Sequence, residues 1–277
     1  MGEDLGKGKK TMDIAFIGGG VMAEALIGGI INGGIASGGE VFVGEPISDR
    51  RSYLENTYGL RASNNNSEVI NKAELIILAV KPQIISGVMA DIKDTIQSNQ
   101  TVLSIVAGTN SRSLREGLDH DLVIRVMPNT PAQIGKGMSV WTASEDVSDK
   151  IKEITGAILN TLGEEIYVSD ETYIDMSTAL SASGPAYVFL FIEALIDAGT
   201  YLGMNREMAR RLVLQTVMGS AELVKESGRH PAELKDMVTS PGGTTIEALR
   251  ALESAGFRSA IFDGVIQAFQ KSKALGG

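Results

Sequence analysis

A short apolar segment followed by three consecutive glycines constrains the fold of this chain more than any other feature. Residues 14–17 are all apolar, Gly18, Gly19 and Gly20 come next, and residues 21–30 place apolar side chains at helical spacing. A continuous apolar run of this length is typical of a buried strand, and the later spacing is typical of an amphipathic helix. The segment therefore predicts a strand, a tight turn and a helix.

The turn also matches a phosphate-binding fingerprint. Gly18, Gly20 and Ala23 occupy the glycine and alanine positions of the pattern G-x-G-x-x-G/A. Gly18 permits a tight turn, Gly20 lets a pyrophosphate approach the backbone, and Ala23 lets the helix pack closely on the strand. Free N–H groups at the helix N-terminus would face the phosphates. Because 32 of the 277 residues are glycine, an ordinary strand-to-helix turn is the alternative.

Strand-like and helix-like segments alternate up to about residue 168. This alternation is typical of a doubly wound, mostly parallel sheet, and with the fingerprint it predicts an α/β N-terminal Rossmann domain. The segments expected to be strands are residues 14–17, 40–46, 74–80, 101–106, 122–127, 138–142 and 164–168.

Only helical spacing follows residue 168, so the second part is predicted to be an all-α C-terminal domain. We expect residues 1–10 to be a flexible tail, residues 11–168 to bind the dinucleotide, and residues 169–277 to bind substrate. Apolar residues on these helices exceed what a small domain buries, which favours subunit contacts. The expected helices are residues 171–183, 185–202, 206–227, 231–238, 245–252 and 257–273.

Composition excludes several classes of function. The net charge of −9 argues against nucleic acid or an anionic membrane as a partner. The chain has no cysteine and two histidines, so no thiolate nucleophile and no metal site are expected. We see no signal peptide, and no apolar run reaches the roughly 18–20 residues that span a bilayer. A cytoplasmic protein is therefore expected.

Polar side chains follow several of the predicted strands. In an open parallel sheet, ligands bind at the carboxyl ends of the strands. Lys81, after the strand at residues 74–80, would reach a ribose or phosphate, and an ordinary solvated lysine is the alternative. Asn129 belongs to a rigid polar loop that would contact the ligand, and an ordinary turn is the alternative. Glu45 would hydrogen-bond ribose hydroxyls and favour NADH, whereas Arg50 and Arg51 would instead reach a 2′-phosphate.

Residues 240–245, with the sequence Ser-Pro-Gly-Gly-Thr-Thr, form a second segment of interest. Gly242 and Gly243 expose backbone N–H groups, and Thr244 with Glu247 fits a capping box that opens a helix. Bare amides at a helix N-terminus bind anions such as a carboxylate. A well-capped helix start without a ligand is the alternative.

Five motifs in this order and at these distances resemble pyrroline-5-carboxylate reductase, over residues 12–273. The Ser-Pro-Gly-Gly-Thr-Thr loop after a Ser-Gly-Pro-Ala-Tyr segment is far more specific than the glycine fingerprint. The motifs occupy residues 18–23, 80–82, 125–131, 183–187 and 240–245.

The resemblance implies the last step of proline biosynthesis, in which NAD(P)H reduces 1-pyrroline-5-carboxylate to L-proline. It also favours NADPH over NADH as the cofactor, because the family commonly uses NADPH. It also implies that the helical domain is a dimerisation domain that intertwines with a second copy, and that dimers assemble into decamers in the family.

By position, the resemblance assigns further cofactor contacts in addition to Glu45 and Asn129. They are Gly18, Gly19, Gly20, Val21, Met22, Ala23, Asn66, Ala79, Val80, Lys81, Pro82, Ile105, Val106 and Ala107. Substrate contacts, together with the loop residues Ser240, Gly242 and Gly243, fall on Glu171, Met237, Thr244 and Thr245. We expect Thr245 to be the catalytic side chain, placed against the ring nitrogen as a hydrogen-bonding group or a relay to water.

Two other classes fit part of the pattern. A related imine reductase or a β-hydroxyacid dehydrogenase has a similar build, but the latter carries a catalytic lysine at helical spacing with an asparagine. Lys225 and Lys235 are the candidates, and the sequence places no asparagine at that spacing from either of them. A non-catalytic dinucleotide-binding sensor would keep the glycine turn but would not need residues 240–245.

Overall fold

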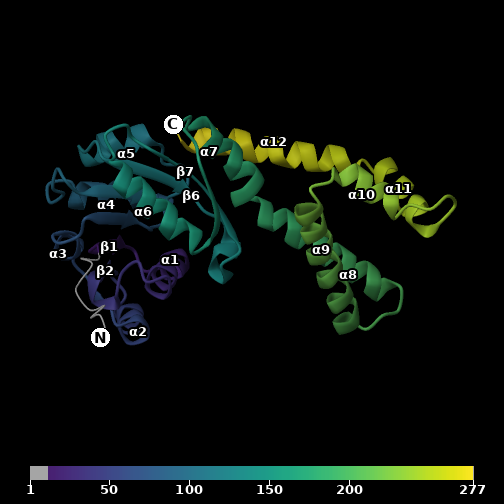
Figure 1. Cartoon of the computed structure of the whole chain (residues 1–277), viewed down its shortest axis with the longest axis horizontal. Helices are drawn as coiled ribbons and strands as arrows, with labels where there is room; N and C mark the ends of the chain where they lie inside the picture. The colour runs from purple at the N-terminus through teal and green to yellow at the C-terminus, as the bar shows by residue number, and fades with distance from the viewer. Residues whose placement is uncertain (1–11, 277) are drawn as a thin grey trace, which may run out of the picture. The chain divides into compact units, whose positions relative to one another are not determined.

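The computed structural model describes residues 12–276, so the predicted tail at residues 1–10 lies outside the described residues. Two compact units make up the chain. The first, here the sheet unit, contains the residues up to Ala182 together with those from Phe269 onward. The second, here the helical unit, is Ser183–Ala268. Figure 1 labels the helices of both units and some of the strands.

The sheet unit is built on an eight-stranded sheet with the order β3-β2-β1-β4-β5-β6-β7-β8. Every neighbouring pair is parallel except β6 and β7, which are antiparallel. The predicted mostly parallel sheet is confirmed. Its strands are β1 (Ile14–Ile17), β2 (Val41–Gly44), β3 (Arg61–Ser63), β4 (Leu75–Leu78), β5 (Thr101–Ser104), β6 (Val123–Met127), β7 (Gly137–Ala143) and β8 (Gly163–Tyr167).

Helices cover both faces of this sheet (Figure 1). Successive side chains of a strand point to opposite faces, and β1 shows the consequence. Ile14 and Phe16 join the core with α1, α2 and α6, whereas Ala15 and Ile17 join the core with α3, α4 and α5. These helices are α1 (Val21–Asn32), α2 (Ser48–Tyr58), α3 (Asn66–Ile70), α4 (Ile85–Ile92), α5 (Ser111–Leu118) and α6 (Asp149–Asn160).

A further helix, α7 (Thr172–Ser177), also lies in the sheet unit. Its Ile174 packs with Met127 of β6 and Val140 of β7, and a π-helical turn at Thr178–Ala182 follows it. The contacts thus divide the chain after Ala182, later than the predicted boundary at residue 168. The apolar contacts of α7 with the sheet account for this difference.

The helical unit contains the remaining helices of the described chain, and they match the predicted ones to within a few residues. Apolar side chains on α8 are largely exposed in a single copy, including Phe189 and Leu190 at 59% and 67%. These helices are α8 (Gly184–Tyr201), α9 (Arg206–Ser227), α10 (Pro231–Met237), α11 (Thr244–Ser254) and α12 (Phe257–Leu275), the last of which continues into the sheet unit.

One helical stretch, Thr172–Tyr201, is long and apolar enough to cross a membrane by length and composition alone. Its most apolar 18-residue window has a mean hydropathy of 1.6, and 6% of that window is buried. The apolar run at residues 186–192 ends at Glu193, as the sequence predicts, and the helix reaches this length because apolar residues continue past Glu193 through Ile196. Length and composition do not distinguish a membrane helix from a helix buried between subunits.

Candidate functional site

The carboxyl ends of four strands in the sheet unit lie side by side. The Gly18 amide donates to the Gly44 carbonyl at 2.8 Å, which joins the ends of β1 and β2. The Ala79 amide donates to the Ile17 carbonyl at 2.9 Å, and that of Ile105 donates to the Leu78 carbonyl at 3.1 Å. The predicted segments after β1, β2, β4 and β5 therefore share one edge of the sheet.

The glycine turn at this edge has the shape that the sequence predicts. Gly18 has a φ of +97°, and a Cβ there would lie 2.7 Å from the Ala79 carbonyl oxygen, so only glycine fits. A Cβ at Gly20 would meet no atom within 4 Å, which leaves open space beside the backbone. Gly20 is also the N-cap of α1 and contributes no side-chain cap, so first-turn N–H groups keep their hydrogen-bonding capacity. Free amides and open space fit a dinucleotide pyrophosphate.

Glu45 lies against this turn with 8% of its surface exposed. Its Oε2 accepts a hydrogen bond from the Gly19 amide at 3.0 Å, and its Oε1 accepts one from the Ile47 amide at 3.0 Å. Both oxygens therefore bind backbone N–H groups of the protein. The sequence identified the residue but not this orientation.

Arg50 contacts the same turn from α2. Its Nε donates to the Gly19 carbonyl at 2.6 Å, and its Nη2 pairs with Glu24 Oε2 at 2.5 Å. Burial alone would raise the pKa of Glu24, but hydrogen bonds from Arg50, Tyr53 and Tyr58 bring this pKa below its ordinary value. The sequence does not identify Glu24 as part of the site, because its partners lie more than twenty residues away and leave no local pattern.

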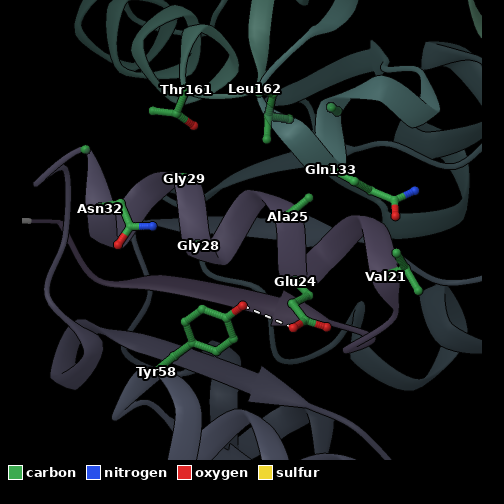
Figure 2. Close-up of a pocket in the computed structure, with 13 residues that line it drawn as sticks. Val21, Glu24, Ala25, Gly28, Gly29, Asn32, Tyr58, Gln133, Thr161 and Leu162 are labelled. Atoms are coloured by element: carbon green, nitrogen blue, oxygen red, sulfur yellow. Dashed lines mark hydrogen bonds between the residues drawn. The ribbon is translucent and has the colours of Figure 1, made fainter. Parts of the chain in front are cut away.

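An open pocket of about 690 Å³ runs along the side of α1, and Figure 2 shows Glu24 and Tyr58 within it. The Tyr58 hydroxyl donates to Glu24 Oε1 at 3.1 Å, drawn as a dashed line in Figure 2. Burial and this bond to a carboxylate raise the pKa of Tyr58 to about 12. Thr161 and Gln133 line the opposite side, and the three glycines of the turn are not part of the lining.

The other predicted cofactor residues differ in exposure. Lys81 is exposed in the segment that follows β4, and Asn66 opens α3 with its Nδ2 donating to Asp91 Oδ2 at 3.1 Å. The Val106 side chain is buried in the core, and its amide donates to the Ser104 hydroxyl at 3.2 Å. Around these residues, Val21, Pro82 and Ala107 are exposed, Met22, Ala79, Val80 and Ile105 are half-buried, and Ala23 is buried.

Asn129 follows β6, and both ends of its side-chain amide are engaged within the protein. Its Oδ1 accepts from the Met138 amide at 2.9 Å, and its Nδ2 donates to the Ser181 carbonyl at 3.2 Å. The same Nδ2 lies 3.3 Å from the Ser181 hydroxyl. Asn129 thus links the end of β6 to the π-helical turn, a contact that the sequence did not predict.

In the helical unit, residues 240–243 form a tight turn before α11. Gly242 has a φ of +64°, and the Gly243 amide donates to the Ser240 carbonyl at 3.1 Å. The expectation that the Gly243 amide is free for an anion is therefore wrong, because the turn itself uses it. The first-turn amides of residues 244–246 lie beyond the turn and have no acceptor within the helix.

The predicted capping box is also wrong. Gly243 is the N-cap of α11, without a side-chain cap, and Thr244 is already the first helical residue. Glu247 instead accepts from Arg250 Nη2 at 3.1 Å. The helix begins one residue earlier than the box requires, and Thr245 lies half-buried in its first turn.

Two predicted substrate residues already have partners. Met237 is exposed at the end of α10, where its sulfur accepts from Arg229 Nη1 at 3.2 Å. Glu171 belongs to the sheet unit, and its Oε1 accepts from Arg125 Nη1 at 2.7 Å and from the Ser111 amide at 2.8 Å. Any contact of Glu171 with substrate would have to use its other carboxylate oxygen.

Known proteins match both parts of the chain. Residues 171–275 match the family model described as pyrroline-5-carboxylate reductase dimerisation, and residues 13–108 match the model described as NADP oxidoreductase, coenzyme F420-dependent. The pyrroline-5-carboxylate reductase of Synechocystis sp. is 44% identical over 96% of this chain and 99% of its own length. The chain belongs to the pyrroline-5-carboxylate reductase family. The Escherichia coli member is 41% identical over 95% of this chain and 97% of its own length.

The solved structures agree with this family. A crystal structure described as Plasmodium falciparum pyrroline carboxylate reductase with NADP bound superimposes with a TM-score of 0.89. It is 36% identical and covers 98% of this chain and 100% of its own. Members of the pyrroline-5-carboxylate reductase family are oxidoreductases that use NAD(P)H, and the dimerisation model covers the helices whose apolar side chains are exposed here. A second copy of the chain therefore accounts for that exposure.

Proposed function

We propose that this protein reduces 1-pyrroline-5-carboxylate to L-proline with NAD(P)H, the last step of proline biosynthesis. The observation that carries the proposal is the nearly full-length identity, 44% and 41%, to two relatives named for this activity. The free amides at the start of α1 and at the start of α11 would supply the two anion sites that this cofactor and this substrate need.

The cofactor would lie along the carboxyl edge of the sheet, with its pyrophosphate at the start of α1. We assign NADPH as the first cofactor and NADH as the alternative, because the Plasmodium falciparum relative is described with NADP bound. The proposed contacts are Gly18, Gly19, Gly20, Val21, Met22, Ala23, Asn66, Ala79, Val80, Lys81, Pro82, Ile105, Val106, Ala107 and Asn129. Glu45 would act at the same site through Gly19, whose amide it binds.

The substrate carboxylate would bind at the start of α11. First-turn N–H groups there carry a partial positive charge that favours an anion. The turn residues Ser240, Gly242 and Gly243 shape this site, and Thr244, Thr245, Met237 and Glu171 are the further proposed contacts.

The reaction adds a hydride to the imine carbon and a proton to the ring nitrogen. Bound NAD(P)H supplies the hydride from C4 of its nicotinamide. The protein residues hold the imine carbon in position, which is the main catalytic task in such a transfer. The Thr245 hydroxyl would hydrogen-bond the ring nitrogen. Because a threonine hydroxyl holds its proton tightly, the proton comes from solvent through this group or from an already protonated iminium.

Residues 11–168 would bind the cofactor, residues 169–277 would bind substrate and form the dimer, and such dimers would assemble into a decamer. A net charge of −9 agrees with a cytoplasmic enzyme whose partners are small molecules rather than nucleic acid or membrane. Light scattering on the purified protein tests the assembly directly. A dimer alone would remove the decamer from the proposal, and a monomer would remove both.

The proposed reaction is tested by the loss of nicotinamide absorbance with purified protein and 1-pyrroline-5-carboxylate, with NADPH and NADH in parallel. We expect turnover with both cofactors, faster with NADPH. No turnover from a folded protein that still binds the dinucleotide would point to another imine or keto substrate, or to a sensor.

A further inference from the structure

Two side chains, Glu45 directly after β2 and Arg50 in the first turn of α2, bind both backbone groups of Gly19, the central glycine of the turn. Glu45 accepts from the Gly19 amide at 3.0 Å, and Arg50 donates to the Gly19 carbonyl at 2.6 Å. Because neither bond follows from the glycine pattern itself, this turn has a support that the fingerprint does not include.

The surroundings of Glu45 fix its orientation. Its second oxygen accepts from the Ile47 amide at 3.0 Å, and 8% of the residue is exposed. Arg51 Nη1 donates to the carbonyls of Glu45 and Pro46, each at 2.8 Å, which holds the segment itself in place. A rotation of the Glu45 carboxylate toward a ribose would leave the buried Gly19 amide without an acceptor, which is unfavourable.

Charges of both signs surround the turn, with carboxylates at Glu24 and Glu45 and guanidinium groups at Arg50 and Arg51. A lone carboxylate beside a pyrophosphate would repel it. Here the guanidinium of Arg50 lies at the same turn and pairs with Glu24 at 2.5 Å. Arg51 Nη1 binds the Glu45 backbone carbonyl at 2.8 Å, so the two carboxylates near the turn have two guanidinium groups beside them while Glu45 accepts from Gly19.

We propose that Glu45 and Arg50 are positioning residues of the phosphate-binding turn, which hold Gly19 so that the first-turn amides of α1 point at the cofactor pyrophosphate. This proposal rests on the proposed NAD(P)H-dependent function. The pyrophosphate is common to both cofactors, so Glu45 sets the affinity for NADH and NADPH together. A ribose contact by Glu45 would instead affect the two cofactors in opposite directions.

The test compares Glu45→Ala with the wild-type protein by isothermal titration calorimetry with NADPH and with NADH. Loss of one charge-assisted hydrogen bond corresponds to about a tenfold change in a dissociation constant. We expect both dissociation constants to rise about tenfold, with their ratio unchanged within about twofold. Tighter NADPH binding with weaker NADH binding would assign Glu45 to the ribose and overturn the proposal. Two unchanged dissociation constants would also overturn it, because Glu45 would then have no role in cofactor binding.

Asp49→Asn is the matched control. Asp49 is an exposed carboxylate in the first turn of α2 and makes no contact with Gly19, so the substitution removes one negative charge and leaves the support of the turn in place. Both of its dissociation constants should stay at the wild-type values. Weakening equal to that of Glu45→Ala would make the effect one of charge alone and overturn the proposal.

Hydrogen exchange of the peptide that covers residues 14–25 provides a readout apart from binding. Without cofactor, the amide hydrogens of this peptide should exchange faster in Glu45→Ala than in the wild-type protein, while the exchange of peptides from α5 and α6 stays unchanged. Unchanged exchange at the turn would contradict the proposal. A wild-type protein that binds neither dinucleotide would instead contradict the proposed function, so the two failures are distinguishable.

Discussion

The guanidinium of Arg125, on β6, lies with its Nη1 2.7 Å from Oε1 of Glu171, at the start of α7. Its Nη2 lies 3.0 Å from Asp175 Oδ1, and the Ser272 hydroxyl at the end of α12 donates to the same oxygen at 3.2 Å. Arg125 is 1% exposed, whereas the two carboxylates keep partial contact with water. One buried cation thus ties α7 and the end of α12 to the sheet within the sheet unit.

Replacing Arg125 should therefore be more damaging than replacing an arginine at the surface. We expect Arg125→Met to lower the free energy of unfolding by about 3 kcal/mol, because it leaves two partly buried carboxylates without their cation. The control is Arg115→Met, which breaks the exposed pair with Asp121 and should cost less than about 1 kcal/mol. Urea denaturation at one protomer concentration measures both, and equal losses would contradict the role assigned to Arg125.

Most of the sheet could be predicted because its strands carry an unambiguous signal. The apolar runs of β1, β4 and β5 are buried on both faces, and burial of both faces is what produces such runs. β3 was missed because Arg61–Ser63 is a short edge strand without an apolar run. The sequence carries little information about such a strand, since its pairing with β2 places it.

The candidate site could be predicted as residue types but not as orientations. Position in the chain places Glu45 and Asn129 at strand ends, yet their side chains bind Gly19 and Ser181, which lie far away in sequence. The capping box failed for a related reason. α11 begins one residue earlier than the capping box requires, so Thr244 is the first helical residue and not the N-cap. Sequence spacing alone does not fix the end of a helix to one residue.

Gly18 and Gly20 should respond differently to the same substitution. Gly18→Ala places a methyl group 2.7 Å from the Ala79 carbonyl oxygen at a φ of +97°, so it should lower the free energy of unfolding by about 2 kcal/mol or more. Gly20→Ala meets open space and should cost less than about 1 kcal/mol. Its methyl group would instead crowd the proposed pyrophosphate and weaken cofactor binding.

Thermal unfolding and calorimetric titration with NADPH separate these two effects. Wild-type affinity in a stable Gly20→Ala protein would show that the cofactor does not approach the backbone there. A Gly18→Ala protein as stable as the wild type would show that the turn adapts to a side chain.

Tyr58 should make the stability of the protein depend on alkaline pH. Its pKa in the folded protein is raised from 10.0 to about 12, because burial and the bond to Glu24 favour the protonated hydroxyl. A raised pKa contributes stability that is complete below pH 10.0 and is lost as the pH rises toward 12. The stability difference between wild type and Tyr58→Phe should therefore be constant at neutral pH and shrink over this range.

Urea denaturation at several pH values measures this difference, with the exposed Tyr201 as the control. Tyr201→Phe should follow the wild-type protein throughout. A difference between wild type and Tyr58→Phe that stays constant to the highest pH would contradict the shifted pKa of Tyr58.

Thr245 should contribute to catalysis through its hydroxyl. It lies half-buried in the first turn of α11, beside the amides proposed to bind the substrate carboxylate. If the hydroxyl bonds the ring nitrogen, Thr245→Ala should lower kcat/KM by about tenfold to a hundredfold, the range expected for one lost hydrogen bond near developing charge. Thr245→Ser keeps the hydroxyl and should retain most of the activity, whereas a packing role for the methyl group would impair both variants. Steady-state kinetics with both cofactors, together with thermal unfolding, decide between these roles. An unchanged kcat/KM in a folded Thr245→Ala protein would remove Thr245 from the site.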